Sequence, residues 1–192
     1  MNTRINEIVN RIKAMQLELE AELDHAREHL NYHLVNRKVR FEEGVRAQQR
    51  RFKINLLGYA LFPRLRHVLV APFVYSVLPA LLLLDLLASL YHAVCFPLLG
   101  IPKVKRSDYF VYDRHHLAYL NLLEIVNCAY CSYGSGLISY VKEIVGRTEQ
   151  YWCPIKHAQR VLAAHSHYAN FTDYGDAEAY RRELDHIRQF KN

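Results

Sequence analysis

The pattern of apolar and charged positions divides the chain into parts of different character. From residue 3 to residue 36, apolar side chains recur in steps of three and four, and no proline or glycine precedes Gly44. This spacing lines them up along one helix face, so we predict one long N-terminal helix. The helix forms either a coiled coil with a copy or a helical partner, or it packs on its own chain. The stripe comprises Ile5, Ile8, Ile12, Met15, Leu19, Leu23, Ala26 and Leu30.

A basic stretch follows this stripe and extends to residue 53. Basic residues on one helix face with aromatic residues on another are typical of a helix that lies on anionic lipid. Nucleic acid would be bound by the same charges, but the stretch leads directly into an apolar segment, so we predict an anionic membrane and no nucleic acid. The alternative is a solvated charged face. The basic residues are Arg37, Lys38, Arg40, Arg46, Arg50, Arg51 and Lys53.

Residues 68–101 are almost entirely apolar, which predicts a membrane segment because a spanning helix needs about 20 such residues. Three prolines interrupt the segment and a fourth, Pro102, follows it directly, and proline kinks or ends a helix. Two topologies follow: a single tilted span over residues 73–96, or a re-entrant hairpin bent near residues 76–79. Basic residues flank both ends, which favours the hairpin with both ends in the cytoplasm. The flanking residues are Arg64, Arg66, Lys103, Lys105 and Arg106.

The apolar segment contains three polar residues at helical spacing. Asp85, Ser89 and His92 are spaced by four and three, which places them on one helical face. Charge at membrane depth is unfavourable, so such residues face protein or water and often serve function. The alternative is that Asp85 pairs with a partner and simply fixes the segment.

The remainder of the chain predicts a small helical domain. Helices are expected over residues 114–129 and 137–150, separated by Gly134 and Gly136, and over residues 154–165 after a proline at the first helical position. A last helix is expected from Asp176, which is a good N-cap. The whole chain is therefore predicted to be all-α, with a helix at 1–55, a membrane segment at 56–106 and a cytoplasmic domain at 107–192.

Composition agrees with a helical, membrane-associated protein. The 192 residues include only seven glycines and six prolines, which suits a helical fold better than a sheet. The net charge of +6 favours an anionic partner. The first twenty residues lack the apolar core of a secretory signal, so we expect the thiols to stay reduced.

Three of the four cysteines, together with one histidine, are spaced as zinc ligands. Cys128 and Cys131 form a C-x2-C pair, and Cys153 and His157 form a C-x3-H pair some twenty residues later. Four protein ligands predict a structural zinc ion that holds the helical domain together, because a catalytic zinc normally leaves one position to water. The alternatives are no metal, iron, a labile redox pair or a catalytic metal.

A second polar group lies just before the cysteines and contains Asp113, His116 and Glu124. On one helix these side chains share a face, and a carboxylate three residues from a histidine is the pairing found in helical di-iron sites. No second pair matches it. The alternatives are an N-cap role for Asp113 or a carboxylate that orients a zinc-bound histidine. His165 and His167 alternate in a polar loop.

Three segments of the second half resemble a family of small, uncharacterised bacterial membrane-associated proteins. They cover about residues 95–160, whereas the N-terminal helix lies outside the match. The resemblance implies a bacterial protein with a cysteine-rich helical domain at a membrane, and it implies no activity. The segments are CFPLLGIPKVKRSDYFVYDRHHLAYLN, NCAYCSYGSG and RTEQYWCPIKHA.

Three functions remain open at this point. The first is a membrane-anchored interaction or scaffold protein on the cytoplasmic side of a bacterial inner membrane, whose residues 3–36 recruit a copy of itself or a helical partner. The second is a membrane enzyme that acts on a lipid or quinone-like substrate through Asp113, His116 and Glu124. The third is a redox or metal sensor in which Cys128 and Cys131 form a disulfide and release zinc.

Overall fold

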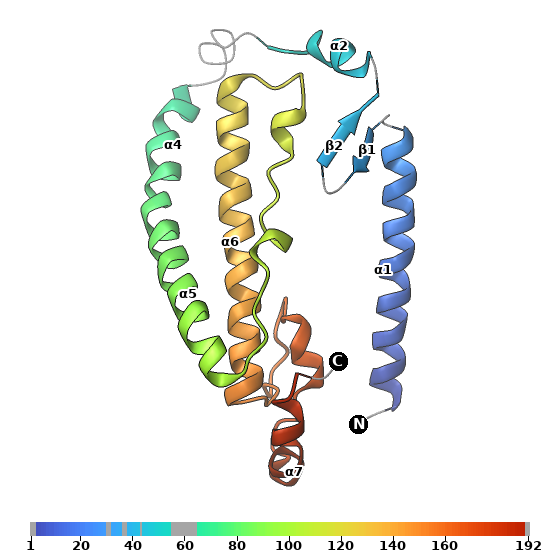
Figure 1. The fold of residues 1–192 in the computed structure, drawn as a ribbon, viewed down its shortest axis with the longest axis vertical. Helices are drawn as coiled ribbons and strands as arrows, with labels where there is room; N and C mark the ends of the chain where they lie inside the picture. The colour runs from blue at the N-terminus through green and yellow to red at the C-terminus, as the bar shows by residue number, and fades with distance from the viewer. Residues whose placement is uncertain (1–2, 30–31, 36–37, 43, 55–64, 191–192) are drawn as a thin grey trace. The chain divides into compact units, whose positions relative to one another are not determined.

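The structure is a computed structural model that describes residues 3–29, 32–35, 38–42, 44–54 and 65–190. It is mostly helical, with 69% helix and almost no strand, which confirms the helical class (Figure 1). Two compact units emerge: Met1–Tyr59 with Asp113–Ile125, and Ala60–Tyr112 with Val126–Asn192. The elements are α1 (Thr3–His29), β1 (Tyr32–Val35), β2 (Lys38–Phe41), α2 (Val45–Arg50), α4 (Leu65–Ser76), α5 (Leu78–Leu99), α6 (Leu122–Trp152) and α7 (Ala177–Ile187).

The N-terminal helix is shorter than the sequence predicts. It ends at His29, and the chain then forms a hairpin in which β1 and β2 pair antiparallel, with Tyr32 opposite Phe41. The prediction of a helix across residues 1–55 is therefore wrong. The aromatic and β-branched residues of the two strands favour a pleated, half-buried ladder, and α2 covers only part of the basic stretch. Arg37 lies outside the described residues.

The apolar stripe of α1 faces solvent. Its five large members with described side chains are between 45% and 65% exposed, and charged residues such as Arg11 and Glu18 lie between them on the same helix. A helix with this pattern usually covers its stripe with another helix. The stripe is therefore a surface available to a partner. The five large members are Ile8, Ile12, Met15, Leu19 and Leu23, and Ala26 is exposed as well.

The apolar segment forms α4 and α5, which follow one another with Val77 between them. Residues Leu69–Leu99 form one helix that is long and apolar enough to cross a membrane, and Leu81 N donates to Val77 O at 3.1 Å in the turn after Val77. The alternative of a re-entrant hairpin bent near residues 76–79 is wrong. Pro79 lacks the N–H that would bond to Tyr75 O, so one helical bond is missing between α4 and α5, but the helix continues beyond it.

A glycine cap ends α5 and turns the chain back along it. Gly100 is left-handed (φ 67°), Ile101 N donates to Phe96 O at 2.9 Å, and Gly100 N donates to Pro97 O at 3.3 Å. This pair of bonds is the Schellman arrangement, which joins apolar residues on either side of the cap. Accordingly, Phe96 and Ile101 belong to the buried core with Val104. Residues 101–112, here called the return segment, start from this cap.

Helix α6 lies beside α4 and α5 and runs in the same direction (Figure 1). Tyr130 OH donates to Val74 O at 2.7 Å near the start of α6, and Tyr140 OH meets His92 Nδ1 at 3.2 Å farther along. Contacts that advance together along both helices define a parallel pair. Parallel neighbours require the chain to travel back between them, and the return segment begins that path.

The prediction of two helices separated by Gly134 and Gly136 is also wrong, because α6 is continuous through both glycines. A Cβ at Gly136 would lie 2.8 Å from Tyr109 O, and one at Gly134 would lie 3.5 Å from a Leu81 methyl. The first of these contacts is too close for any side chain. Gly136 therefore serves the close approach of the return segment rather than a helix end.

In the C-terminal part, the helix predicted from Asp176 is confirmed and the helix predicted over residues 154–165 is not. Asp176 caps α7 by accepting a hydrogen bond from Ala179 N at 2.9 Å. The helix predicted over residues 154–165 is absent, and its first residues instead pair with Thr172 in a short parallel bridge. Thr172 N donates to Pro154 O at 2.9 Å, and Lys156 N donates to Thr172 O at 2.8 Å.

Candidate functional site

The one aspartate and the one histidine between residues 69 and 99 lie on the inner face of the apolar helix, together with Ser89. Asp85 and Ser89 are half-buried and His92 is buried, as their spacing on one face predicts. The outer face is different in kind. Among the described side chains from residue 69 to residue 99, every exposed one is apolar except Ser76, whose hydroxyl donates to Phe73 O at 2.7 Å. The helix is thus polar towards the protein and apolar towards its surroundings.

Asp85 is paired with an arginine of the return segment. Arg106 Nη1 and Nη2 donate to the two carboxylate oxygens at 2.5 and 2.6 Å, which is the bidentate geometry of a strong charge-assisted pair. Tyr133 OH of α6 adds a bond of 2.9 Å and Ser89 adds one of 3.2 Å. The guanidinium also lies 4.1 Å from the centre of the Phe110 ring. This carboxylate joins α5, α6 and the return segment.

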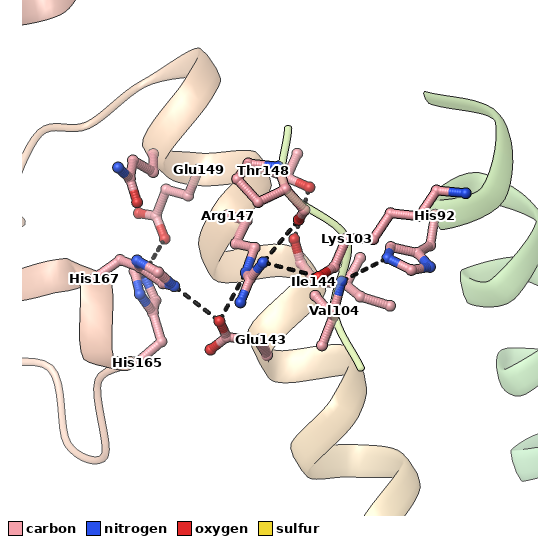
Figure 2. Close-up of polar contacts among 12 residues, drawn as sticks. His92, Lys103, Val104, Glu143, Ile144, Arg147, Thr148, Glu149, His165 and His167 are labelled. Carbon is pink, nitrogen blue, oxygen red and sulfur yellow. Dashed lines mark hydrogen bonds and ion pairs between the residues drawn. The ribbon is translucent and has the colours of Figure 1, made fainter. Parts of the chain in front are cut away.

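His92 fastens the return segment lower on the same face. Its Nε2 accepts a hydrogen bond from Val104 N at 2.9 Å, as Figure 2 shows. A nitrogen that accepts carries no proton, so Nδ1 holds the proton of the neutral ring and donates to the Tyr140 hydroxyl oxygen at 3.2 Å. Both ring nitrogens are therefore satisfied, and His92 positions the backbone rather than exchanging a proton.

A cluster of histidines and glutamates forms at the C-terminal half of α6 (Figure 2). It consists of Glu143, Arg147, Glu149, His165 and His167, here called the histidine–glutamate cluster. Glu143 accepts from Arg147 Nε at 2.8 Å and pairs with His167 Nε2 at 2.9 Å, and Glu149 pairs with His165 Nε2 at 2.9 Å. Two contacts thus attach the turn at residues 166–170 to α6.

The charge of Glu143 is stabilised by this arrangement. Burial acts to raise its pKa, but hydrogen bonds from His167 and Arg147 outweigh burial and hold the pKa below its ordinary value. Arg147 also donates to Pro102 O at 2.7 Å, which connects the cluster to the start of the return segment. The ionised Glu143 carboxylate thus links α6 to the turn at residues 166–170, and its role is structural.

His165 is packed tightly against the helix. A Cβ at Gly146 would lie 2.7 Å from the His165 ring, so glycine is needed at that position for the imidazole to lie on α6. His165 Nδ1 is buried and has no hydrogen-bond partner among the described residues. The ring therefore presents one bonded nitrogen to Glu149 and one unbonded nitrogen to the protein interior.

The three residues predicted to act together beside the membrane do not share a helix. Glu124 and Asn121 form a capping box at the start of α6: Glu124 accepts from Asn121 N at 2.8 Å and donates its own N–H to Asn121 Oδ1 at 3.0 Å. Asp113 precedes a short 3-10 turn and is exposed, and His116 ends that turn. Burial, together with the charges of His115 and Arg46, lowers the pKa of His116.

Asp113 instead lines a hollow of about 410 Å³ within the first unit. Three aromatic rings surround the hollow, and Gln49 at its wall accepts a hydrogen bond from Ala118 N at 3.2 Å. His116 and Glu124 are not among the lining residues. The lining comprises Tyr32, Val39, Phe41, Gln49, Asp113, Arg114, Leu117 and Tyr119.

The four predicted zinc ligands are not brought together. Cys128 and Cys131 lie in α6 and Cys153 follows its last residue, so at about 1.5 Å of rise per residue Cys131 and Cys153 lie about 33 Å apart. Cys131, Cys153 and His157 are exposed. In the described part of the chain, no group of three or more His, Cys, Asp or Glu side chains is placed to hold a metal ion. The reason is the continuous α6, which the sequence did not predict.

Sequence reasoning missed the partners that complete these contacts. In the sequence Arg106 is only one of the basic residues that flank the apolar segment, and no pattern marks Tyr133 or Tyr140. No periodicity relates them to α5, because they meet it through the return segment and the parallel packing of α6. Glu143 and Arg147 do carry a local signal, since their spacing of four is that of a helical ion pair.

Comparison of the chain with protein-family models, with curated proteins and with solved structures finds no match. The resemblance to bacterial membrane-associated proteins therefore stays a prediction. The feature that bears most on function is α5, whose exposed face is apolar and whose inner face carries Asp85, Ser89 and His92.

Proposed function

We propose that the protein is a membrane-anchored interaction protein. Helix α4–α5 holds the chain in a lipid bilayer, and the stripe of α1 recruits a helical partner or a second copy. The observation that carries the proposal is the polarity of the apolar helix: apart from Ser76 its described exposed side chains are apolar, and Asp85, Ser89 and His92 are bonded inside the protein. Zinc is not part of the proposal, because its four predicted ligands lie apart.

The exposed apolar surface supports anchoring in lipid. Contiguous apolar surface of this extent is unusual for a protein in water and marks a membrane or partner site. The polar groups beneath it have partners, which is the usual arrangement of polar residues near a membrane. The exposed large side chains are Leu69, Val70, Phe73, Val74, Val77, Leu82, Leu83, Leu86, Leu87, Leu90, Val94 and Leu98.

The basic residues support the cytoplasmic side of a bacterial inner membrane. Lys103 and Lys105 follow the apolar helix and are exposed, and positive charge next to a membrane segment marks the cytoplasmic side. The same charges favour anionic lipid. This placement also agrees with the bacterial family that the second half resembles.

Two measurements on the full chain test the proposal. The purified protein, mixed with vesicles of phosphatidylcholine and phosphatidylglycerol, is expected to float with the vesicles and to resist release by high salt, because apolar burial holds it. Sedimentation analysis in mild detergent is expected to give a complex larger than one chain, or capture of a helical protein. Recovery in the soluble fraction without lipid would contradict the anchoring.

A second candidate function is favoured by the hollow beside Asp113. Its aromatic lining and the Asp113–Arg114 edge suit a flat apolar molecule with a polar group, which is the chemistry of a quinone-like substrate. Binding of a soluble quinone analogue, followed by tyrosine fluorescence, is expected to weaken in Asp113→Asn and in Tyr119→Ala. Glu124→Gln serves as the control, because Glu124 caps α6. Equal binding by all variants would reject this function.

A further inference from the structure

The two faces of α5 differ at the very middle of the apolar helix. Asp85 lies near the centre of Leu69–Leu99, and the Arg106 side chain that binds it is 44% exposed. At the same level the opposite face presents Leu83 and Leu86, both exposed. An exposed guanidinium at the centre of a bilayer is strongly unfavourable. The inner face therefore requires water beside the middle of the helix.

The path of the chain gives a second, independent reason. Val104 meets His92 and Arg106 meets Asp85, so the return segment runs back along α5. If α5 crossed the bilayer, this segment would lie at the same depth. It contains irregular backbone and exposed Lys103, Lys105 and Asp108. Irregular backbone is tolerated at membrane depth only inside protein or beside a water-filled cavity.

We infer that α4–α5 does not cross the bilayer but lies along one leaflet. Its apolar face enters the acyl region, and the return segment and α6 face water. This inference rests on the proposed membrane anchoring and adds its geometry. The 31-residue helix then extends about 46 Å along the surface. Both ends of the apolar segment lie on one side, as the basic residues at its two flanks predict.

The depth of three positions along the outer face distinguishes the two geometries. Phe73, Leu86 and Leu98 are 76%, 65% and 80% exposed, and each is replaced in turn by a cysteine that carries a fluorophore. Depth in vesicles of phosphatidylcholine and phosphatidylglycerol is measured with quenchers fixed at different levels of the lipid. Ser139→Cys on the exposed part of α6 is the water-facing control. The native thiols are replaced by serine at Cys95, Cys128, Cys131 and Cys153.

If the helix lies along one leaflet, all three positions should have equal depths, about 5–10 Å below the headgroups. The fluorophore at residue 139 should not be quenched. A spanning helix predicts a different profile. Leu86 then lies about 15 Å deep, which is half of the hydrocarbon thickness, and the two end positions are shallow. That profile would overturn the inference and leave the anchoring intact. Absence of quenching at every position would overturn both.

The unmodified protein provides a second measurement that does not depend on cysteine variants. It is added to sealed vesicles and treated with an amine reagent that cannot pass the membrane, and modified lysines are identified by mass spectrometry. One leaflet predicts modification of Lys13, Lys103 and Lys142 from the outside to the same extent as in detergent. Loss of at least half of the modification at Lys103 and Lys142, relative to Lys13, would overturn the inference.

Discussion

Helices α1 and α5 both expose rows of large apolar side chains, but their surroundings differ. On α1, charged residues separate the members of the stripe, and Leu19 is 59% exposed next to Glu18 and Glu20. On α5, the exposed face between Leu78 and Leu99 contains no polar residue. Exposure alone therefore does not identify the environment of an apolar side chain. The residues around it do, since a charged surround suits a protein partner in water and an uncharged one suits lipid.

The largest expected effect comes from a charge on the outer face of α5. Leu86→Lys is expected to weaken membrane association by about 3 kcal/mol, because an ammonium group does not tolerate the acyl region. Flotation with vesicles measures the change. Gln16→Lys on α1, where charge is already frequent, is the matched control and is expected to float like the unchanged protein. Equal loss in both variants would remove the contrast between the helices.

The inner face of α5 is tested through the pair that holds it. Arg106→Ala leaves Asp85 without its bidentate partner and is expected to lower the free energy of unfolding by about 2 kcal/mol. The double variant Asp85→Leu, Arg106→Leu is expected to recover most of this loss, because no uncompensated charge remains. Thermal unfolding in detergent measures both. Failure of the double variant to recover would mean that the pair contributes more than compensation of charge.

The histidine–glutamate cluster predicts a pH dependence that the apolar face of α5 lacks. The pKa of Glu143 is held below its ordinary value of 4.5, so its stabilisation is complete above that value and is lost as pH falls through the lower, folded pKa. Glu143→Gln is expected to destabilise the protein by about 1–2 kcal/mol at pH 7 and to flatten the acid limb of the unfolding curve. Glu178→Gln, at a side chain 90% exposed, should leave that limb unchanged.

The smallest expected effect on stability comes from the α1 stripe. Ile12→Gln removes an apolar side chain that is half exposed, so the free energy of unfolding should change by less than about 0.5 kcal/mol. Flotation should also be unchanged, whereas the complex seen by sedimentation should be lost. A stability loss comparable to that of Arg106→Ala would show that the stripe packs within its own chain.

Two local patterns in the sequence predicted their features correctly, whereas the proline expected to start a helix at residue 154 does not start one. The spacing of Asp85, Ser89 and His92 gave their common face, and Asp176 gave the start of α7. The prediction that Gly136 ends a helix was wrong. Glycine is needed there because the carbonyl of Tyr109, which is remote in the sequence, lies too close for a side chain. The four predicted metal ligands lie apart for a related reason, since ligand spacing carries no information on whether the intervening chain turns back or continues as a helix.

The partners of Asp85 also have an order in time. Arg106 is 21 residues downstream and Tyr133 is 48 residues downstream, so at about 5–20 residues per second of synthesis the arginine emerges within about 1–4 s and the tyrosine within about 2–10 s. The carboxylate is thus neutralised by a near neighbour before α6 exists. The apolar helix can meet lipid early, with its one acidic residue already paired, and the rest of the second unit assembles on it afterwards.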